Sequence, residues 1–239
     1  MKKYCYFVSN EEHWFKVAEE LYNKNIAKPV FWIGDDIHYK KARELFGDCV
    51  VPDLEFRHRI YNLNDIDYNG EFIEFFKSKN YSRAKDISIK MMDRLDIYGL
   101  FGRLDRETYF HYMVIWTLKN FNKSQPDVLI CSEAPHDHVK YIVYEICLFL
   151  KIPCYKFNNW NLAPLMFLQN METDEIIKKK ANINFGNFDK ILNTRIKYFV
   201  DGLLNKNKIH ELSYMKDLKN KTRFFPKIFF FITKQKSVP

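Results

Sequence analysis

One run of residues says most about the architecture of this 239-residue chain: Pro126-Asp127-Val128-Leu129-Ile130-Cys131-Ser132-Glu133-Ala134-Pro135-His136-Asp137-His138. Its apolar part shows no alternation, which is typical of a parallel strand buried on both faces. Apolar residues then recur at helical spacing and indicate a helix that packs on the sheet: Val139, Ile142, Val143, Ile146 and Leu150. The polar residues between the two patterns therefore lie where a strand meets the amino end of a helix. In open α/β sheets this is the usual ligand site, and it favours an anionic ligand.

Strand and helix patterns alternate from the amino terminus onward. Strands are predicted at residues 4–8, 29–33 and 49–52, with a helix at 39–46. Ser9-x-x-Glu12 has the spacing of a capping box before a helix that carries Trp14, Val17, Ala18 and Leu21. Consecutive crossovers of this kind give a right-handed, doubly wound parallel sheet. The ends of its strands meet at one rim.

The remaining chain is predicted to be more helical. Residues 53–122 show helical patterns at 71–77, 83–95 and 106–121 without a convincing strand between them, so we expect a helical insertion or a cap over the rim. A strand at 152–157 follows, and residues 160–220, including 188–204, look helical again. We expect an α/β domain over residues 1–170, doubly wound with a mostly parallel Rossmann-like sheet. A basic, mainly helical extension over 171–239 ends in a strand-like run at 226–233 that would open a second domain.

Composition limits the class of protein. Hydrophobic residues make up 47% of the chain and charged residues 28%, which is ordinary for a globular protein. The net charge of +8 lies within residues 171–239, because residues 1–170 carry equal numbers of basic and acidic side chains. A basic extension can contact an anionic membrane surface peripherally or bind nothing, and its lysine run is most often a solvated helix face. Nucleic acid is not expected, because no Arg stripe or zinc-finger spacing accompanies it.

The cysteines and the amino terminus indicate a compartment. The five cysteines form no C-x-x-C pair and four lie in or beside apolar runs, so they are expected to be buried thiols of a cytoplasmic protein. The apolar run at residues 4–8 ends too early for a signal peptide, and no segment has the roughly 20 apolar residues that span a bilayer. We therefore expect a cytoplasmic protein, with any membrane contact at the inner face.

Candidate chemistry concentrates at the polar end of the opening run. Proline is favoured in a first helical turn, so His136 and Asp137 are expected to start the helix where both can face the crevice. His136 can then take a proton from a sugar hydroxyl or pair with a phosphate, with Asp137 orienting it. Glu133 can serve as the base instead. The alternative is structural, in which Asp137 caps the helix and His136 bonds to a neighbouring loop.

Other candidates lie at strand ends that meet at the same rim. The candidate substrate-binding residues there are Ser9, Asn10, Asp35, Ser132 and His138. His13, in the first helical turn, and Arg94, near Gly99-Leu100-Phe101-Gly102, join them, although an ordinary surface position is the alternative for each.

Several reaction classes lack their motif. Adjacent residues on a helix diverge by about 100°, so His136-Asp137-His138 is a poor metal site and no metal is expected. The chain has no G-x-S-x-G elbow, no G-x-G-x-x-G and no phosphate-binding P-loop. A hydrolase in this crevice would lack a nucleophile, and a dinucleotide or P-loop nucleotide cofactor is disfavoured.

Several of these motifs together resemble a known family. Tyr6-Phe7-Val8-Ser9-Asn10, Val30-Phe31-Trp32-Ile33-Gly34-Asp35, the Met92-Asp93-Arg94 and Arg106 region, and Pro126-Asp127 followed by Ala134-Pro135-His136 resemble the amino-terminal half of capsular-polysaccharide glycosyltransferases with two Rossmann-like domains. The likeness covers roughly residues 4–170, and its motifs are moderately specific.

The resemblance implies a function and a division of labour. The amino-terminal domain of such enzymes generally holds the sugar acceptor and the catalytic base, and the second domain holds the nucleotide-sugar donor, usually without metal. It places His136 and Asp137 on the acceptor side, with His13 as a weaker candidate. This chain ends where the second domain would begin, so we expect the acceptor-binding half of a sugar-transfer enzyme. The alternative is a non-catalytic sugar- or partner-binding module derived from the same fold.

Overall fold

A six-stranded sheet in the order β3-β2-β1-β4-β5-β6 forms the centre of the computed structural model. The structure describes residues 1–52, 55, 70–96, 98–160, 165–177, 193–194 and 197. The strands are β1 (Lys2–Val8), β2 (Ala27–Gly34), β3 (Val50–Val51), β4 (Val128–Cys131), β5 (Cys154–Trp160) and β6 (Leu165–Asn170). The first five run parallel to their neighbours, and β6 pairs antiparallel with β5. The predicted doubly wound, mostly parallel Rossmann-like α/β fold is confirmed.

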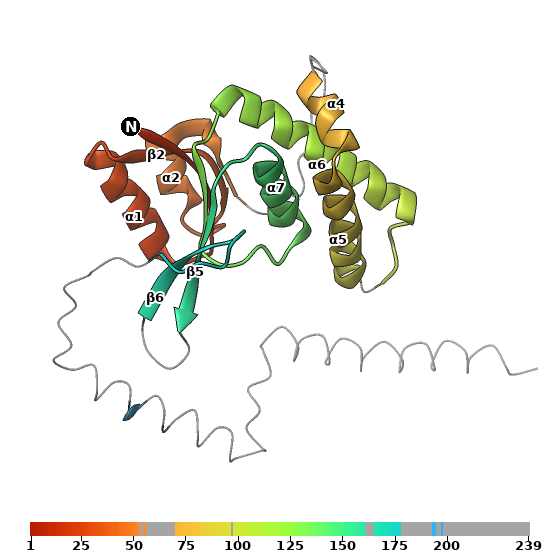
Figure 1. Ribbon diagram of the computed structural model, residues 1–239. Coiled ribbons are helices and arrows are strands. Elements are labelled where there is room, and N and C mark those ends of the chain that lie inside the picture. The colour runs from red at the N-terminus through yellow and green to blue at the C-terminus, as the bar shows by residue number, and fades with distance from the viewer. Residues whose placement is uncertain are drawn as a thin grey trace, which may run out of the picture. The chain divides into compact units, whose positions relative to one another are not determined.

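Helices cover both faces of this sheet (Figure 1). They are α1 (Glu12–Asn23), α2 (Tyr39–Phe46), α4 (Gly70–Lys77), α5 (Lys79–Leu95), α6 (Arg103–Ser124) and α7 (His138–Phe149), with a short 3-10 turn at Gly47–Cys49. In Figure 1, α1 and α2 lie on one side of the sheet and α6 and α7 on the other, with α5 outside them. Right-handed crossovers produce this arrangement when one set proceeds in one direction along the sheet and the other set in the opposite direction.

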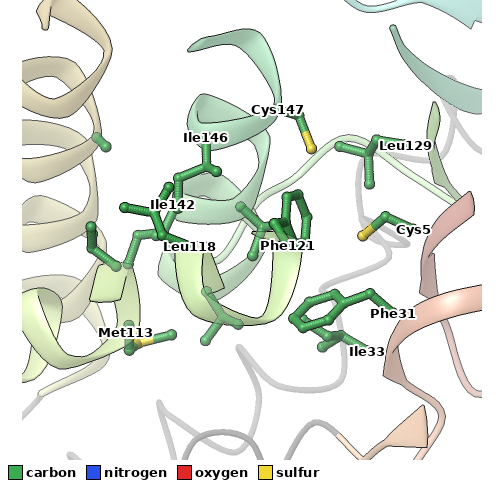
Figure 2. Close-up of a cluster of buried hydrophobic side chains, with 14 of the residues drawn as sticks. Cys5, Phe31, Ile33, Met113, Leu118, Phe121, Leu129, Ile142, Ile146 and Cys147 are labelled. Atoms are coloured by element: carbon green, nitrogen blue, oxygen red, sulfur yellow. The ribbon is translucent and has the colours of Figure 1, made fainter. Parts of the chain in front are cut away.

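Alternation along β1 and β2 divides the core between the two faces. Tyr4, Tyr6 and Trp32 pack with Trp14 and Phe15 of α1 in one cluster. Cys5, Phe31 and Leu129 point the other way, toward the buried residues of α6 and α7. Figure 2 shows this second cluster, in which Met113, Leu118 and Phe121 meet Ile142, Ile146 and Cys147. Both faces of the central strands are therefore buried, as the unbroken apolar runs predict.

A buried ion pair joins α5 to α7. The carboxylate of Glu145 is completely buried, and its two oxygens accept from Nε and Nη2 of Arg83 at 2.6 and 2.7 Å. Asn80 donates to the same carboxylate at 3.0 Å. Because a buried carboxylate is costly without such partners, these bonds specify how α5 sits on α7.

The thiols behave as the cysteine pattern predicts. All five cysteines are free, and Cys5, Cys131, Cys147 and Cys154 are buried while Cys49 is half-buried. Burial raises the pKa of the Cys5, Cys131 and Cys147 thiols well above the ordinary value. They serve as small apolar residues of the core.

Two local predictions are wrong, and a third is decided between its alternatives. Residues 165–170 form strand β6 rather than helix, because they pair with β5. Ser9 does not cap α1: the N-cap is Glu11 without a side-chain cap bond, and the Ser9 hydroxyl bonds to Glu11 and Trp14 instead. Of the two alternatives for residues 53–122, α6 fits the helical insertion and not the cap over the rim, because seven of its residues, including Met113 and Phe121, are buried under the face of the sheet.

The chain divides into two units. One comprises Met1–Trp160 and Leu165–Ala181, and the other comprises Asn161–Pro164 and Asn182–Pro239. The expected helix at 188–204 and strand at 226–233 lie outside the described residues except for 193–194 and 197, as does most of the predicted 171–239 extension.

Candidate functional site

The rim where β1, β2 and β4 end is the place at which the winding of the sheet reverses. β1 lies between β2 and β4, and the helices that follow β1 and β4 leave on opposite faces of the sheet. The connections therefore diverge at the carboxyl ends of the strands, which is the general ligand position in such sheets. We call the ends of these three strands, residues 8–10, 34–38 and 131–140, the switch-point rim.

Gly34 brings the β1 and β2 ends of this rim into close contact. Its φ is +115°, and a Cβ at this position would lie 2.0 Å from the Val8 carbonyl oxygen, so only glycine fits. Just beyond it, Oδ1 of Asn10 accepts a hydrogen bond from the Asp36 backbone N–H at 3.0 Å. The Asn10 side chain thus ties the two loops together.

Asp35 is a buried carboxylate at the end of β2. Its φ is +54°, and its side chain is fully shielded from solvent. Oδ1 accepts from the backbone N–H of His38 at 2.8 Å and lies 2.9 Å from Nδ1 of the same residue. Oδ2 is buried and has no hydrogen-bond partner among the described residues. The Asp35-x-x-His38 spacing is the sequence signal that could have revealed His38.

Ser132 holds the end of β4 against β1. Its backbone N–H donates to the Phe7 carbonyl at 2.7 Å. Its hydroxyl is buried and, within the part of the chain that the structure describes, has no hydrogen-bond partner. Asp35 Oδ2 and Ser132 Oγ are thus two unused polar atoms on either side of the end of β1.

His136 is the most accessible ionisable group of the rim, with 60% of its side chain exposed. Its Nδ1 lies 3.2 Å from the Ala134 carbonyl oxygen and 3.6 Å from Oε1 of Glu133. A carbonyl only accepts, so Nδ1 carries the proton in the neutral ring and Nε2 has a free lone pair. No described residue bonds to Nε2. The Arg94 guanidinium donates to the His136 carbonyl at 3.2 Å and places α5 beside this loop.

Asp137 takes the capping role that was the alternative to an orienting one. It is the N-cap of α7, and its Oδ1 accepts from the Lys140 N–H at 2.9 Å. The helix starts at His138, so the expectation that His136 and Asp137 lie inside its first turn is wrong. The Lys140 ammonium lies 3.6 Å from Asp137 and 3.7 Å from Glu133, on a side chain that is 9% exposed. Lys140 was not predicted, although its i,i+3 spacing from Asp137 signals the pair.

The remaining predicted residues have local contacts. The ring of His138 is buried and lies against Tyr109, so it faces the helical layer. His13 is exposed and packs on the Trp14 ring. Ser9 donates to Glu11, and this hydrogen bond, with a further one from Trp14, lowers the pKa of the Glu11 carboxyl.

Two further features concern metals and membranes. In the described ranges, no group of three or more His, Cys, Asp or Glu side chains has the arrangement of a metal site. Within the same ranges, no helix combines the length and the apolar character needed to cross a bilayer.

Fold and rim together define an α/β protein with a doubly wound sheet and polar residues at the switch point of its strands. Comparison with family models, with curated proteins and with solved structures finds no match to this chain.

Proposed function

We propose that this chain binds the sugar acceptor of a glycosyl transfer in surface or capsular polysaccharide biosynthesis, at the switch-point rim. His136 is the base in this proposal, and the nucleotide-sugar donor binds to a second domain. The chain itself is then the acceptor-binding half of the enzyme. The resemblance implies a reaction without metal or resident cofactor.

The observation that carries the proposal is the position of His136, whose side chain is open to solvent and whose Nδ1 lies 3.2 Å from the Ala134 carbonyl oxygen. In the neutral ring this contact suits a proton on Nδ1, which leaves Nε2 as the basic nitrogen. A neutral imidazole with a free lone pair is the form that accepts a proton from a hydroxyl. Glu133, 3.6 Å from the ring, stabilises the imidazolium that forms.

The proposed step is a nucleophilic displacement at the anomeric carbon of the donor sugar. The acceptor hydroxyl oxygen forms a bond to the anomeric carbon of the donor while the bond from that carbon to the nucleotide phosphate breaks. The hydroxyl proton passes to Nε2 of His136, and the nucleotide leaves with the electron pair. Asp35 and Ser132, at the ends of the strands on either side of β1, lie beside the proposed acceptor position.

Sugar transfer in extracts of the native cells tests this role. The gene is replaced by variants at its own locus, and incorporation from radiolabelled nucleotide sugars into polysaccharide is measured. His136→Gln is expected to lower incorporation by about 100-fold, the usual contribution of a general base. Glu133→Gln is expected to have a smaller effect, about tenfold, because it only stabilises the charged ring.

The matched control is Glu44→Gln, which removes an exposed carboxylate from α2. It is expected to leave incorporation unchanged, and all three purified variants are expected to melt within about 1 °C of the wild type because surface substitutions cost little. Unchanged transfer in His136→Gln would reject the proposal.

A binding module without catalysis is the second candidate, and specific observations favour it. Asp137 and Asn10 carry structural hydrogen bonds, so these polar groups shape the rim. Under this alternative, the purified chain binds oligosaccharides prepared from the cell's own surface polysaccharide, and His136→Gln weakens that binding. Deleting the gene would then leave incorporation by extracts unchanged.

A further inference from the structure

We infer that the protein has a second ligand site, at the open edge of β2, that binds a nucleoside phosphate. The site is a cavity of about 480 Å³ beside the amino-terminal half of β2. It is distinct from the switch-point rim, which lies at the carboxyl ends of the strands. Lys3, Lys28, Trp116 and Ser124 contribute to its lining, and we call it the edge pocket.

The short length of β3 creates the opening. β3 pairs only with Trp32 and Ile33, although β2 starts at Ala27. In the portion that the structure describes, residues 27–31 therefore have a neighbouring strand on the β1 side alone. The end of α2 closes the pocket on one face of the sheet and the last turns of α6 close it on the other.

The charge of the pocket favours an anion. Lys3, Lys28 and Lys123 belong to its lining, and none of the three forms an ion pair with a described residue. By contrast, lysines 16, 24, 77, 85, 90 and 140 are each paired with a carboxylate. Asp48 is the acidic residue of the lining. The balance is two uncompensated positive charges, which matches a phosphate monoester.

Aromatic rings supply a surface for a flat group. Trp116 and Phe46 are half-buried in the lining and keep part of their surface accessible. Packing fixes both: Trp116 lies 5.5 Å from the ring of Phe31, and Phe46 stacks on Trp32 at 5.8 Å. Fixed rings lose little entropy when a base stacks on them.

The volume of the cavity suits a small ligand. It lies within the range of about 300–1,000 Å³ that small ligands occupy. Anion charge, flat surface and volume together fit a nucleoside monophosphate.

Calorimetric titration of the full chain at low salt tests the proposal. The probes are AMP, GMP, UMP and CMP, each compared with its nucleoside and with inorganic phosphate. At least one nucleotide is expected to bind about tenfold or more tightly than both its nucleoside and phosphate, since both parts contribute. Lys28→Gln and Lys123→Gln are each expected to weaken it by about three- to tenfold and to reduce its salt dependence. Trp116→Leu is expected to weaken it at constant salt dependence.

The matched control is Lys79→Gln, an exposed lysine of α5 away from the pocket. It is expected to bind the nucleotide like the wild type, as is His136→Gln, which separates this site from the switch-point rim. Because Lys28 and Lys123 are exposed, both variants should fold. The proposal is overturned if no nucleotide of the panel binds, if nucleosides bind equally well, or if the two lysine variants match Lys79→Gln.

Discussion

Gly34→Ala tests the contact that builds the switch-point rim. The added Cβ would lie 2.0 Å from the Val8 carbonyl oxygen, so β1 and β2 have to move apart at this point. The φ of +115° costs a non-glycine residue about 1–3 kcal/mol. Separation of the strands further removes the hydrogen bond between Asn10 and Asp36 and weakens the strand pairing beside it. At about 1 kcal/mol for each bond, the total loss of unfolding free energy is about 3–5 kcal/mol.

Gly47→Ala is the matched control, because Gly47 also has a positive φ, +77°, but no atom within 4 Å of its added Cβ. Gly47→Ala therefore introduces the strain of a positive φ at a non-glycine residue, without a steric clash of the added Cβ. Urea unfolding of both variants is the assay, and Gly34→Ala is expected to be less stable than the control by about 2 kcal/mol. Equal stabilities would refute the argument that the close approach of Val8 requires glycine at position 34.

Three further outcomes follow from the geometry. Asp137→Ala is expected to lower the unfolding free energy by about 1 kcal/mol, because α7 loses its N-cap. Asparagine is also a good N-cap, so Asp137→Asn is expected to stay close to the wild type in stability. Equal losses in the two variants would contradict the capping role. Burial raises the pKa of the Cys49 thiol to about 11, so only about one molecule in a thousand carries this thiolate at pH 8. A chromogenic disulfide reagent is therefore expected to react slowly with the native protein and fully in denaturant. Rapid reaction of several native thiols would contradict the burial. Backbone N–H groups of Phe101 and Leu100, with Arg106, hold the pKa of Asp96 below its ordinary value of 3.8. The ionised Asp96 therefore stabilises the fold above the unfolded-state pKa, and this stabilisation is lost as pH falls through the lower folded-state pKa. In acid titrations followed by circular dichroism, Asp96→Asn is expected to show a shallower loss of stability below pH 3.8 than the wild type. An identical acid profile of the two proteins would argue against this role.

The pattern of apolar residues was sufficient to predict most of the fold. The unbroken runs at 4–8, 29–33 and 128–131 predicted central parallel strands because both faces of such strands are buried. Strand β6 was missed because its Leu165, Phe167 and Leu168 fit either period and only the pairing with β5 decides between them. Local pattern cannot contain that long-range contact.

The site was predictable in position but less so in detail. Strand ends located the rim, since parallel strands bring their carboxyl ends to one edge. The capping box at Ser9 was wrong because the Trp14 indole competes for the hydroxyl. His136 and His138 look equivalent in the sequence, yet the start of α7 turns one outward and buries the other. Side-chain direction depends on that boundary, which local sequence places only within a few residues.

Backbone amide NMR of the full chain, titrated with oligosaccharides from the cell's own surface polysaccharide, tests the central claim most directly. We expect the largest shift changes at the three strand ends, at residues 9–10, 34–38 and 132–140, and weaker binding in a His136→Gln variant, which removes the exposed ring of the rim. Shift changes confined to other parts of the chain, or binding that His136→Gln leaves unchanged, would contradict the account.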